Sequence, residues 1–237
     1  MDGVVPAAGE GTRLRPLTDG RPKGLVELRG RPLLAYAFDT LLELGVSSLV
    51  VVIGHRGDAI VERFGDAYEG VPIEYVEQPE PVGLADAVRR AEPHVDDDFV
   101  LLNGDNVFAA APTRLVERHR AADADATLLV DEVSTDEAAA TGVLRFDDDG
   151  TLEGVVEKPV DPPSTRVTRG CYVFSPVAFH ACHLVRPSAR GEHELSDAVD
   201  LLLGAGRTVE TVPFEGRCVN VNTPDDLQAA GQLVAER

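Results

Sequence analysis

Residues 7–23 read AAGEGTRLRPLTDGRPK and directly follow the apolar pair Val4-Val5, which begins the first expected strand. Glycine lets a backbone approach a phosphate closely, and a turn rich in exposed N–H groups binds anions. Six basic residues and only two acidic ones lie between Arg13 and Arg31, although the formal net charge of the chain is −19. The segment therefore predicts a phosphate-binding loop after the first strand of an α/β fold, with a polyanion as its ligand.

Hydrophobic periodicity outward from this loop predicts alternating strands and helices in the first half of the chain. Continuous apolar runs rich in β-branched residues indicate buried strands, and apolar residues at helical spacing indicate amphipathic helices. The expected strands are residues 49–53, 73–76 and 99–102. One helix is expected with the apolar face Leu34/Ala37/Phe38/Leu41 and should end before Gly45, and a second is expected with the apolar face Leu84/Ala87/Val88/Ala91. This order predicts right-handed crossovers and a parallel, doubly wound sheet.

The rhythm changes after about residue 125, where short apolar segments predict a β-rich region. Strands are expected at residues 126–133, 142–146, 152–157 and 167–174, a hairpin turn at 147–150, and helices at 196–203 and from Pro224 onward, with Thr223 as the cap. No linker or repeat separates the halves. We therefore expect one α/β domain over residues 1–237 with a single Rossmann-like, doubly wound mixed sheet. Its nucleotide-binding half is about residues 1–125, and its β-rich acceptor-binding half is about residues 126–237.

The composition excludes several classes of function. The 43% of hydrophobic residues suffices for a core, and no apolar run reaches the roughly 18 residues of a membrane span. Because the N-terminus lacks the pattern of a signal peptide, we expect a cytoplasmic protein without membrane partners. The 41 acidic residues disfavour nucleic acid, since a phosphate backbone needs a basic face. The same acidity is typical of proteins from salt-rich cytoplasms and predicts a halophilic protein.

The cysteines give no sign of redox or metal chemistry. Cys171, Cys182 and Cys218 are odd in number and lack metal-type spacing, so reduced thiols are expected. The cluster His180-Ala181-Cys182-His183 superficially resembles a metal site, but a fourth ligand is missing nearby and the pattern is helical. We interpret this cluster as structural.

Only two lysines occur in the chain, Lys23 and Lys158, and the other basic residues are arginine. A lysine ammonium is a compact charge with rotatable donors, so a site that needs it does not accept a planar guanidinium unchanged. Chance, or retention for packing alone, is the alternative. We predict that both lysines hold phosphates.

The opening loop matches neither of two common nucleotide motifs. It is not a Walker P-loop, because Gly-Lys-Ser/Thr is absent, and Leu14 takes the third glycine position of a dinucleotide fingerprint. The pattern Gly9-x-Gly11-Thr12-Arg13-Leu14-x-Pro16, followed by Pro22-Lys23, resembles the signature of the sugar-1-phosphate nucleotidyltransferases, or nucleoside-diphosphate-sugar pyrophosphorylases. The likeness covers essentially the whole chain and points to archaeal glucose-1-phosphate uridylyl- and thymidylyltransferases. Further matching segments are Gln78-x-x-x-x-Gly83-Leu84-Ala85, Leu102-Asn103-Gly104-Asp105-Asn106, Gly142, Glu157-Lys158-Pro159, Gly170 and Arg190-Gly191-Glu192 through Asp197.

The resemblance implies a Mg²⁺-dependent transfer of a nucleotidyl group from UTP, or dTTP, to glucose 1-phosphate for glycan biosynthesis, commonly by a homo-oligomer. It assigns catalysis to Arg13, Lys23, Asp105 and Lys158, and Mg²⁺ to Asp105 and Asn220. It assigns the nucleotide to Ala7, Ala8, Gly9, Glu10, Gly11, Thr12, Gln78, Gly83 and Leu84, and the sugar phosphate to Gly142, Glu157, Lys158 and Gly170. Arg13 would hold the β- and γ-phosphates, Lys23 would lie between the triphosphate and the acceptor phosphate, and Lys158 would bind the acceptor phosphate.

One segment departs from the family pattern. Many members have Trp-Leu-Asp-x-Gly where this chain has Cys218-Val219-Asn220-Val221-Asn222. An asparagine carbonyl can still ligate Mg²⁺, and related N-acetylglucosamine-1-phosphate uridylyltransferases have an asparagine at this place. Each functional interpretation also has a structural alternative: Asp105 would begin a turn, Gln78 would be a surface-loop residue, and Glu157 would only pair with Lys158.

Rival functions stay open from the sequence. Uracil and thymine differ by one methyl group, which is worth only about 1–3 kcal/mol in a pocket, so a thymidylyltransferase is one alternative. A catalytically silent nucleotide-sugar sensor or regulatory subunit is another, although the joint presence of Arg13, Lys23, Asp105 and Lys158 argues against it. The segment Asn220-Val221-Asn222-Thr223-Pro224-Asp225-Asp226-Leu227 also resembles molybdopterin-type guanylyltransferases, whose first loop differs.

Overall fold

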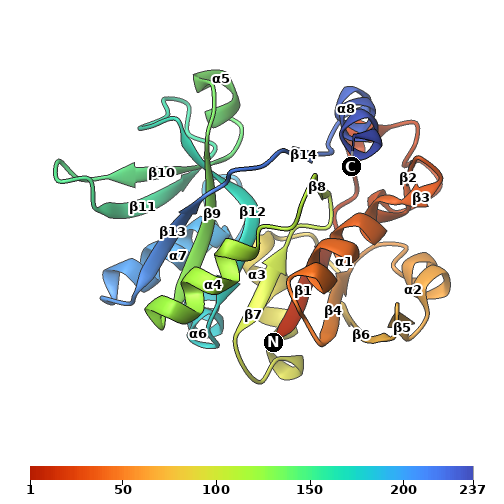
Figure 1. The fold of residues 1–237 in the computed structure, drawn as a ribbon, viewed down its shortest axis with the longest axis horizontal. Coiled ribbons are helices and arrows are strands. Elements are labelled where there is room, and N and C mark those ends of the chain that lie inside the picture. The colour runs from red at the N-terminus through yellow and green to blue at the C-terminus, as the bar shows by residue number, and fades with distance from the viewer. Residues whose placement is uncertain (237) are drawn as a thin grey trace.

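A ten-stranded sheet runs through the molecule, for which the computed structural model describes residues 1–236 (Figure 1). The strands are β1 (Asp2–Ala7), β2 (Glu27–Leu28), β3 (Arg31–Pro32), β4 (Ser48–Ile53), β5 (Ala67–Tyr68), β6 (Val71–Glu77), β7 (Phe99–Leu102), β8 (Asn106–Phe108), β9 (Ala126–Glu132), β10 (Gly142–Phe146), β11 (Leu152–Glu157), β12 (Arg166–Phe174), β13 (Val209–Pro213) and β14 (Cys218–Asn220). The main sheet has the order β11-β10-β12-β7-β1-β4-β6-β5, and β9 pairs with β12 and β13. Two small sheets, β14-β8 and β2-β3, lie beside it.

The sheet is mixed, and its centre is parallel. β1 pairs in parallel with β4 and β7, and β4 pairs in parallel with β6. β12 runs antiparallel to β7, so strands from both halves of the chain belong to one sheet. The predicted α/β architecture with a mixed, doubly wound sheet is confirmed.

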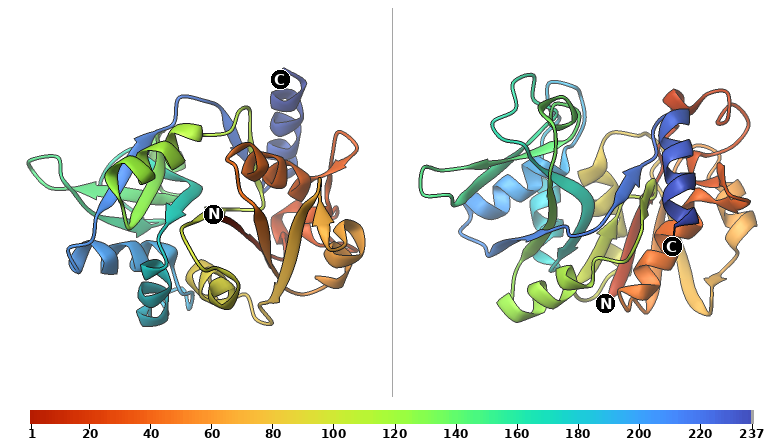
Figure 2. Two further views of the ribbon diagram at one scale, coloured as in Figure 1. Left: turned by 60° about the horizontal axis from the view of Figure 1, so that its bottom comes forward. Right: turned by 45° about the horizontal axis from the view of Figure 1, so that its top comes forward.

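Helices cover both faces of the sheet, because its central strands are apolar on both sides. The helices are α1 (Leu33–Glu43), α2 (Asp58–Phe64), α3 (Leu84–Ala91), α4 (Thr113–Ala122), α5 (Thr135–Ala138), α6 (Val177–Leu184), α7 (Leu195–Gly204) and α8 (Pro224–Ala235), with 3₁₀ turns at Thr12–Leu14, Lys23–Leu25 and Glu92–His94. Val4 packs in a cluster with residues of α3, α6 and α7, whereas Val5 packs with residues of α1 and α4. The left view of Figure 2 shows these helix layers on opposite sides of the sheet.

The elements predicted from periodicity are present. The turn at residues 147–150 joins β10 and β11, and α1 ends at Glu43 before Gly45, which has a φ of 81°. Thr223 caps α8 as predicted: its Oγ1 accepts from the Asp226 N–H, and Asp226 accepts from the Thr223 N–H. The segment around Cys182 forms α6, where Cys182 is buried and His183 bonds to Glu92. The helices α2, α4 and α5 and the strands β2, β3, β5, β8, β13 and β14 were not predicted.

Parallel strands bring their carboxyl ends to one edge of the sheet, where ligands of open α/β sheets bind. The loop of residues 8–23 follows β1, Gln78 follows β6, and Asn103 follows β7 at this edge. Strand β14 adds Asn220 to the same region, because Asn220 pairs with Asn106 of β8. Within residues 1–236, no helix combines the length and apolar character that crossing a membrane requires.

Candidate active site

Two adjoining hollows occupy this edge of the sheet. The first has a volume of about 390 Å³, and the second has a volume of about 730 Å³. Arg13, Asp105 and Lys158 line both, so the two hollows adjoin at these residues. Eight further predicted residues line only the first hollow: Ala7, Ala8, Gly9, Gly11, Thr12, Lys23, Gln78 and Gly83. Four line only the second hollow: Gly142, Glu157, Gly170 and Asn220. Leu84 lines both hollows. The structure thus brings the predicted residues together except for Glu10, which lines neither hollow.

The opening loop presents free backbone donors beside the first hollow. The N–H groups of Gly9, Glu10 and Gly11 donate to no protein group within residues 1–236. Gly11 has a φ of 63°, and a Cβ there would lie 3.0 Å from Lys23 Cβ, so this turn favours glycine. Glu10 can therefore donate a hydrogen bond to a ligand through its backbone N–H, although it lines neither hollow.

Lys23 is fixed by two acceptors from distant parts of the chain. Its Nζ lies 2.6 Å from Asp105 Oδ2 and 2.9 Å from Asn222 Oδ1, and its side chain is 12% exposed. Arg13 Nη2 donates to the same Asn222 oxygen over 2.9 Å. Asn222 thus links the side chains of Arg13 and Lys23, the two cations of the first loop that were predicted to contact phosphates.

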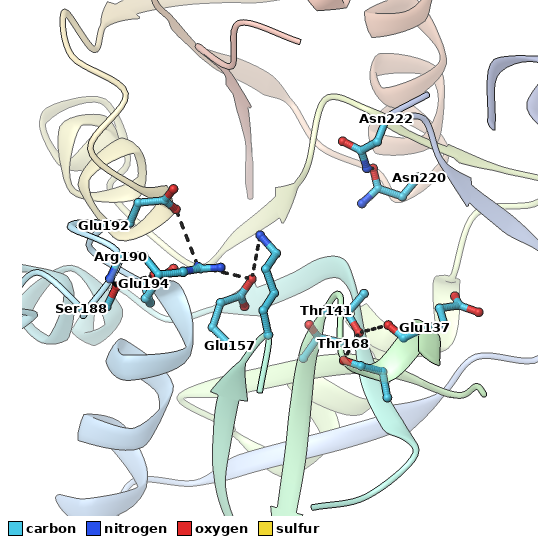
Figure 3. A network of polar contacts seen from close by, with 12 residues as sticks. Glu137, Thr141, Glu157, Thr168, Ser188, Arg190, Glu192, Glu194, Asn220 and Asn222 are labelled. Atoms are coloured by element: carbon cyan, nitrogen blue, oxygen red, sulfur yellow. Dashed lines mark hydrogen bonds and ion pairs between the residues drawn. The ribbon is translucent and has the colours of Figure 1, made fainter. Parts of the chain in front are cut away.

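The side chains around Asp105 fit a divalent cation. Asp105 Oδ1 and Asn103 Oδ1 are buried and have no hydrogen-bond partner within residues 1–236. Asn220 Oδ1 accepts from Asn222 Nδ2 over 2.8 Å and retains a second lone pair (Figure 3). An oxygen-only set with one carboxylate suits a hard cation that phosphates also ligate. Among the described residues, no group of three or more His, Cys, Asp or Glu side chains could hold a metal ion without further ligands.

Lys158 lies at the end of β11, in the wall of the second hollow. Its φ of 47° is left-handed, a conformation that non-glycine residues adopt at a cost and that is found at functional sites. The Nζ lies 3.4 Å from Glu157 Oε1, and the side chain is 45% exposed. The ammonium is therefore weakly held by the protein and open to an anionic ligand.

A charged network surrounds Glu157 (Figure 3). Arg190 Nη2 lies 2.7 Å from Glu194 Oε1, 3.8 Å from Glu192 Oε2 and 3.9 Å from Glu157 Oε1. Burial raises the pKa of Glu157, and the Glu194 charge adds to this, whereas Lys158 and Arg190 oppose it. A carboxylate in this setting can accept hydrogen bonds from sugar hydroxyl groups.

Two glycines keep the second hollow open. A Cβ on Gly142 would lie 3.0 Å from Thr168 Oγ1 and 3.2 Å from Glu157 Oε2. Gly170 has a φ of 62°, and a Cβ there would lie 2.5 Å from Asn106 Nδ2 and 2.7 Å from Asn103 Nδ2. Their lack of a side chain therefore preserves the positions of Glu157 and Asn103.

The far end of the first hollow contains uncharged hydrogen-bonding groups. Gln78 is 4% exposed, so the alternative of a surface-loop residue does not apply. Its Nε2 donates to Gly83 O over 3.0 Å. Gly83 has a φ of 119° and packs so closely on the backbone of His193 that a Cβ has no room. Pro81 and Leu84 add apolar side chains to the lining of this hollow.

Comparisons with known proteins show which family the chain belongs to. The family model described as nucleotidyl transferase matches residues 2–237. The chain belongs to this family. It is 48% identical over 236 residues to the UTP–glucose-1-phosphate uridylyltransferase AglF of Haloferax volcanii, covering 100% of this chain and 97% of that protein. It is 35% identical over 238 residues to a glucose-1-phosphate thymidylyltransferase of Streptomyces griseus, covering 100% of this chain and 66% of that protein.

Solved structures show the same nucleotidyltransferase fold. A Bacillus anthracis protein described as a glucose-1-phosphate thymidylyltransferase, in complex with a sucrose, superposes with a TM-score of 0.90 at 27% identity. That match covers 100% of this chain and 96% of the other. A UDP-glucose pyrophosphorylase complexed with UDP-glucose superposes with a TM-score of 0.89 at 22% identity, covering 99% of this chain and 98% of the other, which shows a shared fold. Nucleotidyltransferases of this family generally use a divalent metal.

The candidate site also contains residues that sequence reasoning missed. Asn103 contributes a buried, unpartnered oxygen, Asn222 links Arg13 to Lys23, and Arg190 holds the carboxylates around Glu157. The segments containing Asn103 and Arg190 had been noted as matching the family, but their side chains had no assigned role. Asn222 replaces a family glycine, and this departure was the one signal that pointed to it.

Proposed function

We propose that this nucleotidyltransferase transfers the uridylyl group of UTP to glucose 1-phosphate, with Mg²⁺ as the metal. One oxygen of the sugar phosphate attacks the α-phosphorus, the bond to the β-phosphate bridging oxygen breaks, and pyrophosphate leaves with UDP-glucose as the other product. The observation that carries this proposal is that Arg13, Lys23 and Lys158 all line the first hollow in a chain of net charge −19. Phosphoryl chemistry of this kind depends on positioning and charge neutralisation, so no nucleophilic side chain is required.

Each part of the two hollows has a task in this proposal. The free N–H groups of residues 9–11 and Arg13 bind the β- and γ-phosphates, and Lys23 stabilises charge between the two substrates. Lys158 binds the acceptor phosphate, and Glu157 accepts bonds from the sugar hydroxyl groups. Held by Asp105 and Asn220, Mg²⁺ would neutralise charge on the phosphate oxygens. The nucleotide thus occupies the half formed by about residues 1–125, and the sugar occupies the half formed by the rest.

The proposed base is uracil because the relative with 48% identity over nearly its whole length carries a uridylyltransferase name. A thymidylyltransferase is the second candidate, supported by the Streptomyces griseus relative at 35% identity. We further propose a cytoplasmic homo-oligomer that supplies UDP-glucose for glycan assembly. The three free cysteines are consistent with this compartment.

A matrix of four nucleoside triphosphates against five sugar 1-phosphates tests the proposed function. Purified protein in molar KCl with Mg²⁺ is expected to release pyrophosphate fastest from UTP with glucose 1-phosphate, and only when both substrates are present. Faster release with dTTP would favour the thymidylyltransferase. Tight binding of a nucleotide sugar without pyrophosphate release from any pair would contradict the enzyme and favour a silent sensor.

A further inference from the structure

The side-chain amide of Gln78 has a single possible orientation. Both hydrogens of Nε2 are used, one on Gly83 O at 3.0 Å and one on Asp86 Oδ2 at 2.9 Å. A flipped amide would place its oxygen against two acceptors, which have no hydrogen to donate. Oε1 accepts from no group within residues 1–236, and Gln78 lines the first hollow. The amide atom left for a ligand is therefore an acceptor.

Asp86 is a buried carboxylate with three side-chain donors. It lies in the first turn of α3, and its side chain is 2% exposed. Arg89 bonds to Oδ1, whereas Arg90 Nε lies 2.7 Å from Oδ2, the oxygen that also accepts from Gln78. Burial alone would raise the pKa of Asp86, but hydrogen bonds from Arg90, Gln78 and Arg89 lower it. Asp86 is thus ionised and can only accept.

The cluster is tied to the end of β6, the strand that directly precedes Gln78. Arg90 Nη1 donates to Glu77 O over 3.2 Å, and the Gln78 N–H donates to Ile53 O over 2.7 Å. The backbone and the amide of Gln78 are both held, so the amide cannot turn without breaking contacts to α3. A buried charge must be paired and hydrogen-bonded, and the Gln78 amide is one of the three side-chain donors that satisfy Asp86.

We propose that Asp86 is a positioning residue that fixes the Gln78 amide, so that the nucleotidyltransferase selects, among pyrimidines, a base with a hydrogen on ring atom N3. Uracil and thymine carry this N3–H donor, whereas N3 of cytosine is an acceptor that faces the Gln78 oxygen without a hydrogen. A base that makes no hydrogen bond to the buried Gln78 oxygen leaves that oxygen unpaired, and such a loss discriminates strongly against the wrong base. This inference rests on the proposed function, because it assumes that the base occupies the end of the hollow beside Gln78.

The test compares kcat/KM for UTP with kcat/KM for CTP in the wild type and in Asp86→Ala. This ratio does not depend on the fraction of protein that is folded, so a merely structural loss leaves it unchanged. The wild type is expected to prefer UTP strongly, and Asp86→Ala is expected to lower the ratio at least tenfold. Dissociation constants for UTP and CTP from calorimetry give the same comparison for a variant with little turnover, and Asp86→Leu replaces Asp86→Ala if the latter does not fold.

Two further variants separate orientation from charge. Arg89→Gln removes a cation from Oδ1 but leaves the bond between Oδ2 and Gln78, so it is expected to keep the wild-type ratio. In a Gln78→Ala background, Asp86→Ala is expected to cause no further fall, because Asp86 acts through Gln78. An Asp86→Ala ratio equal to that of the wild type, or a wild type that uses CTP as well as UTP, would overturn the inference. Absence of turnover and of binding with every triphosphate would instead refute the proposed function.

Discussion

Lys23 and Lys158 differ in how firmly the protein holds them. Lys23 is 12% exposed and bonds to Asp105 and Asn222, whereas Lys158 is 45% exposed and has one carboxylate 3.4 Å away. A preorganised charge needs no reorganisation during the reaction, while a solvated lysine keeps its rotamer freedom until a ligand binds. We expect Lys23 to be in place before either substrate arrives and Lys158 to close on the acceptor phosphate.

Replacing Lys158 is expected to damage use of the sugar phosphate. Lys158→Ala should lower kcat/KM for glucose 1-phosphate by about 100- to 1,000-fold, because a cation that stabilises the reacting phosphate is lost. Lys158→Arg should recover only part of this loss, since a guanidinium does not reproduce the compact ammonium. Steady-state kinetics with each substrate varied in turn measures both effects, and the KM for UTP serves as the control. An arginine variant with wild-type kinetics would show that any cation suffices.

The raised pKa of Glu157 predicts an acid limb in the pH profile. The ionised carboxylate can accept hydrogen bonds from sugar hydroxyl groups with both of its oxygens, whereas the protonated acid carries a hydrogen on one of them. Because burial raises the pKa of Glu157, protonation occurs at a higher pH than for an ordinary glutamate. We expect kcat/KM for glucose 1-phosphate to fall as pH decreases through this raised pKa. The substrate phosphate also titrates, so Glu157→Gln is the control: it should keep the substrate limb and lose the additional one. Identical profiles for both proteins would contradict this role.

At the scale of elements, the start of α8 organises the loop that reaches Lys23. Asp226 Oδ2 accepts from the N–H groups of Asn222 at 2.9 Å and Thr223 at 2.8 Å. Strand β14 holds the other end of this loop through its pairing with β8, and Val221 N–H donates to Asp105 O over 2.9 Å. A helix cap and a three-residue strand pair thus position the amides near the proposed metal site.

Removal of the α8 cap is expected to lower stability by a modest amount. Thr223→Ala should reduce the free energy of unfolding by about 1 kcal/mol, because the Asp226 N–H loses its side-chain acceptor. Thr223→Ser keeps that acceptor and should match the wild type. Urea denaturation in molar KCl measures the difference between these proteins. Equal unfolding midpoints and slopes for all three would show that the cap contributes nothing.

At the scale of the whole molecule, the negative charge sets the conditions for folding. The chain has 41 acidic and 22 basic residues, so repulsion between its negative charges opposes the compact state. Added salt weakens this repulsion, because the distance over which charges interact shortens as the salt concentration rises. We expect Tm to rise between low and molar KCl. Sucrose, which does not screen charge, is the control for general exclusion from the protein surface. A Tm that stays constant or falls in KCl would contradict adaptation to a salt-rich cytoplasm.

Much of the fold could be predicted because local patterns determine it. Strands β10 and β11 have the predicted bounds, since short apolar segments flank an obvious turn at residues 147–150. Helix α4 was missed because its apolar face is short, with Leu115 and Val116 buried beside the polar His119. Contacts of Asn222 with Arg13 and Lys23 could not be predicted, since 209 and 199 residues separate them. Asp86 was also missed, because its burial depends on Gln78 and two arginines that meet only in the folded chain.

The central claim is that the two adjoining hollows hold a uridine nucleotide and a sugar on either side of Lys23 and Lys158. A crystal structure of the protein with UDP-glucose and Mg²⁺ in molar KCl tests it most directly. The account predicts uracil N3 within hydrogen-bond distance of Gln78 Oε1, glucose hydroxyl groups on Glu157, and Mg²⁺ on Asp105. Density for UDP-glucose elsewhere on the protein, with these hollows empty, would contradict it.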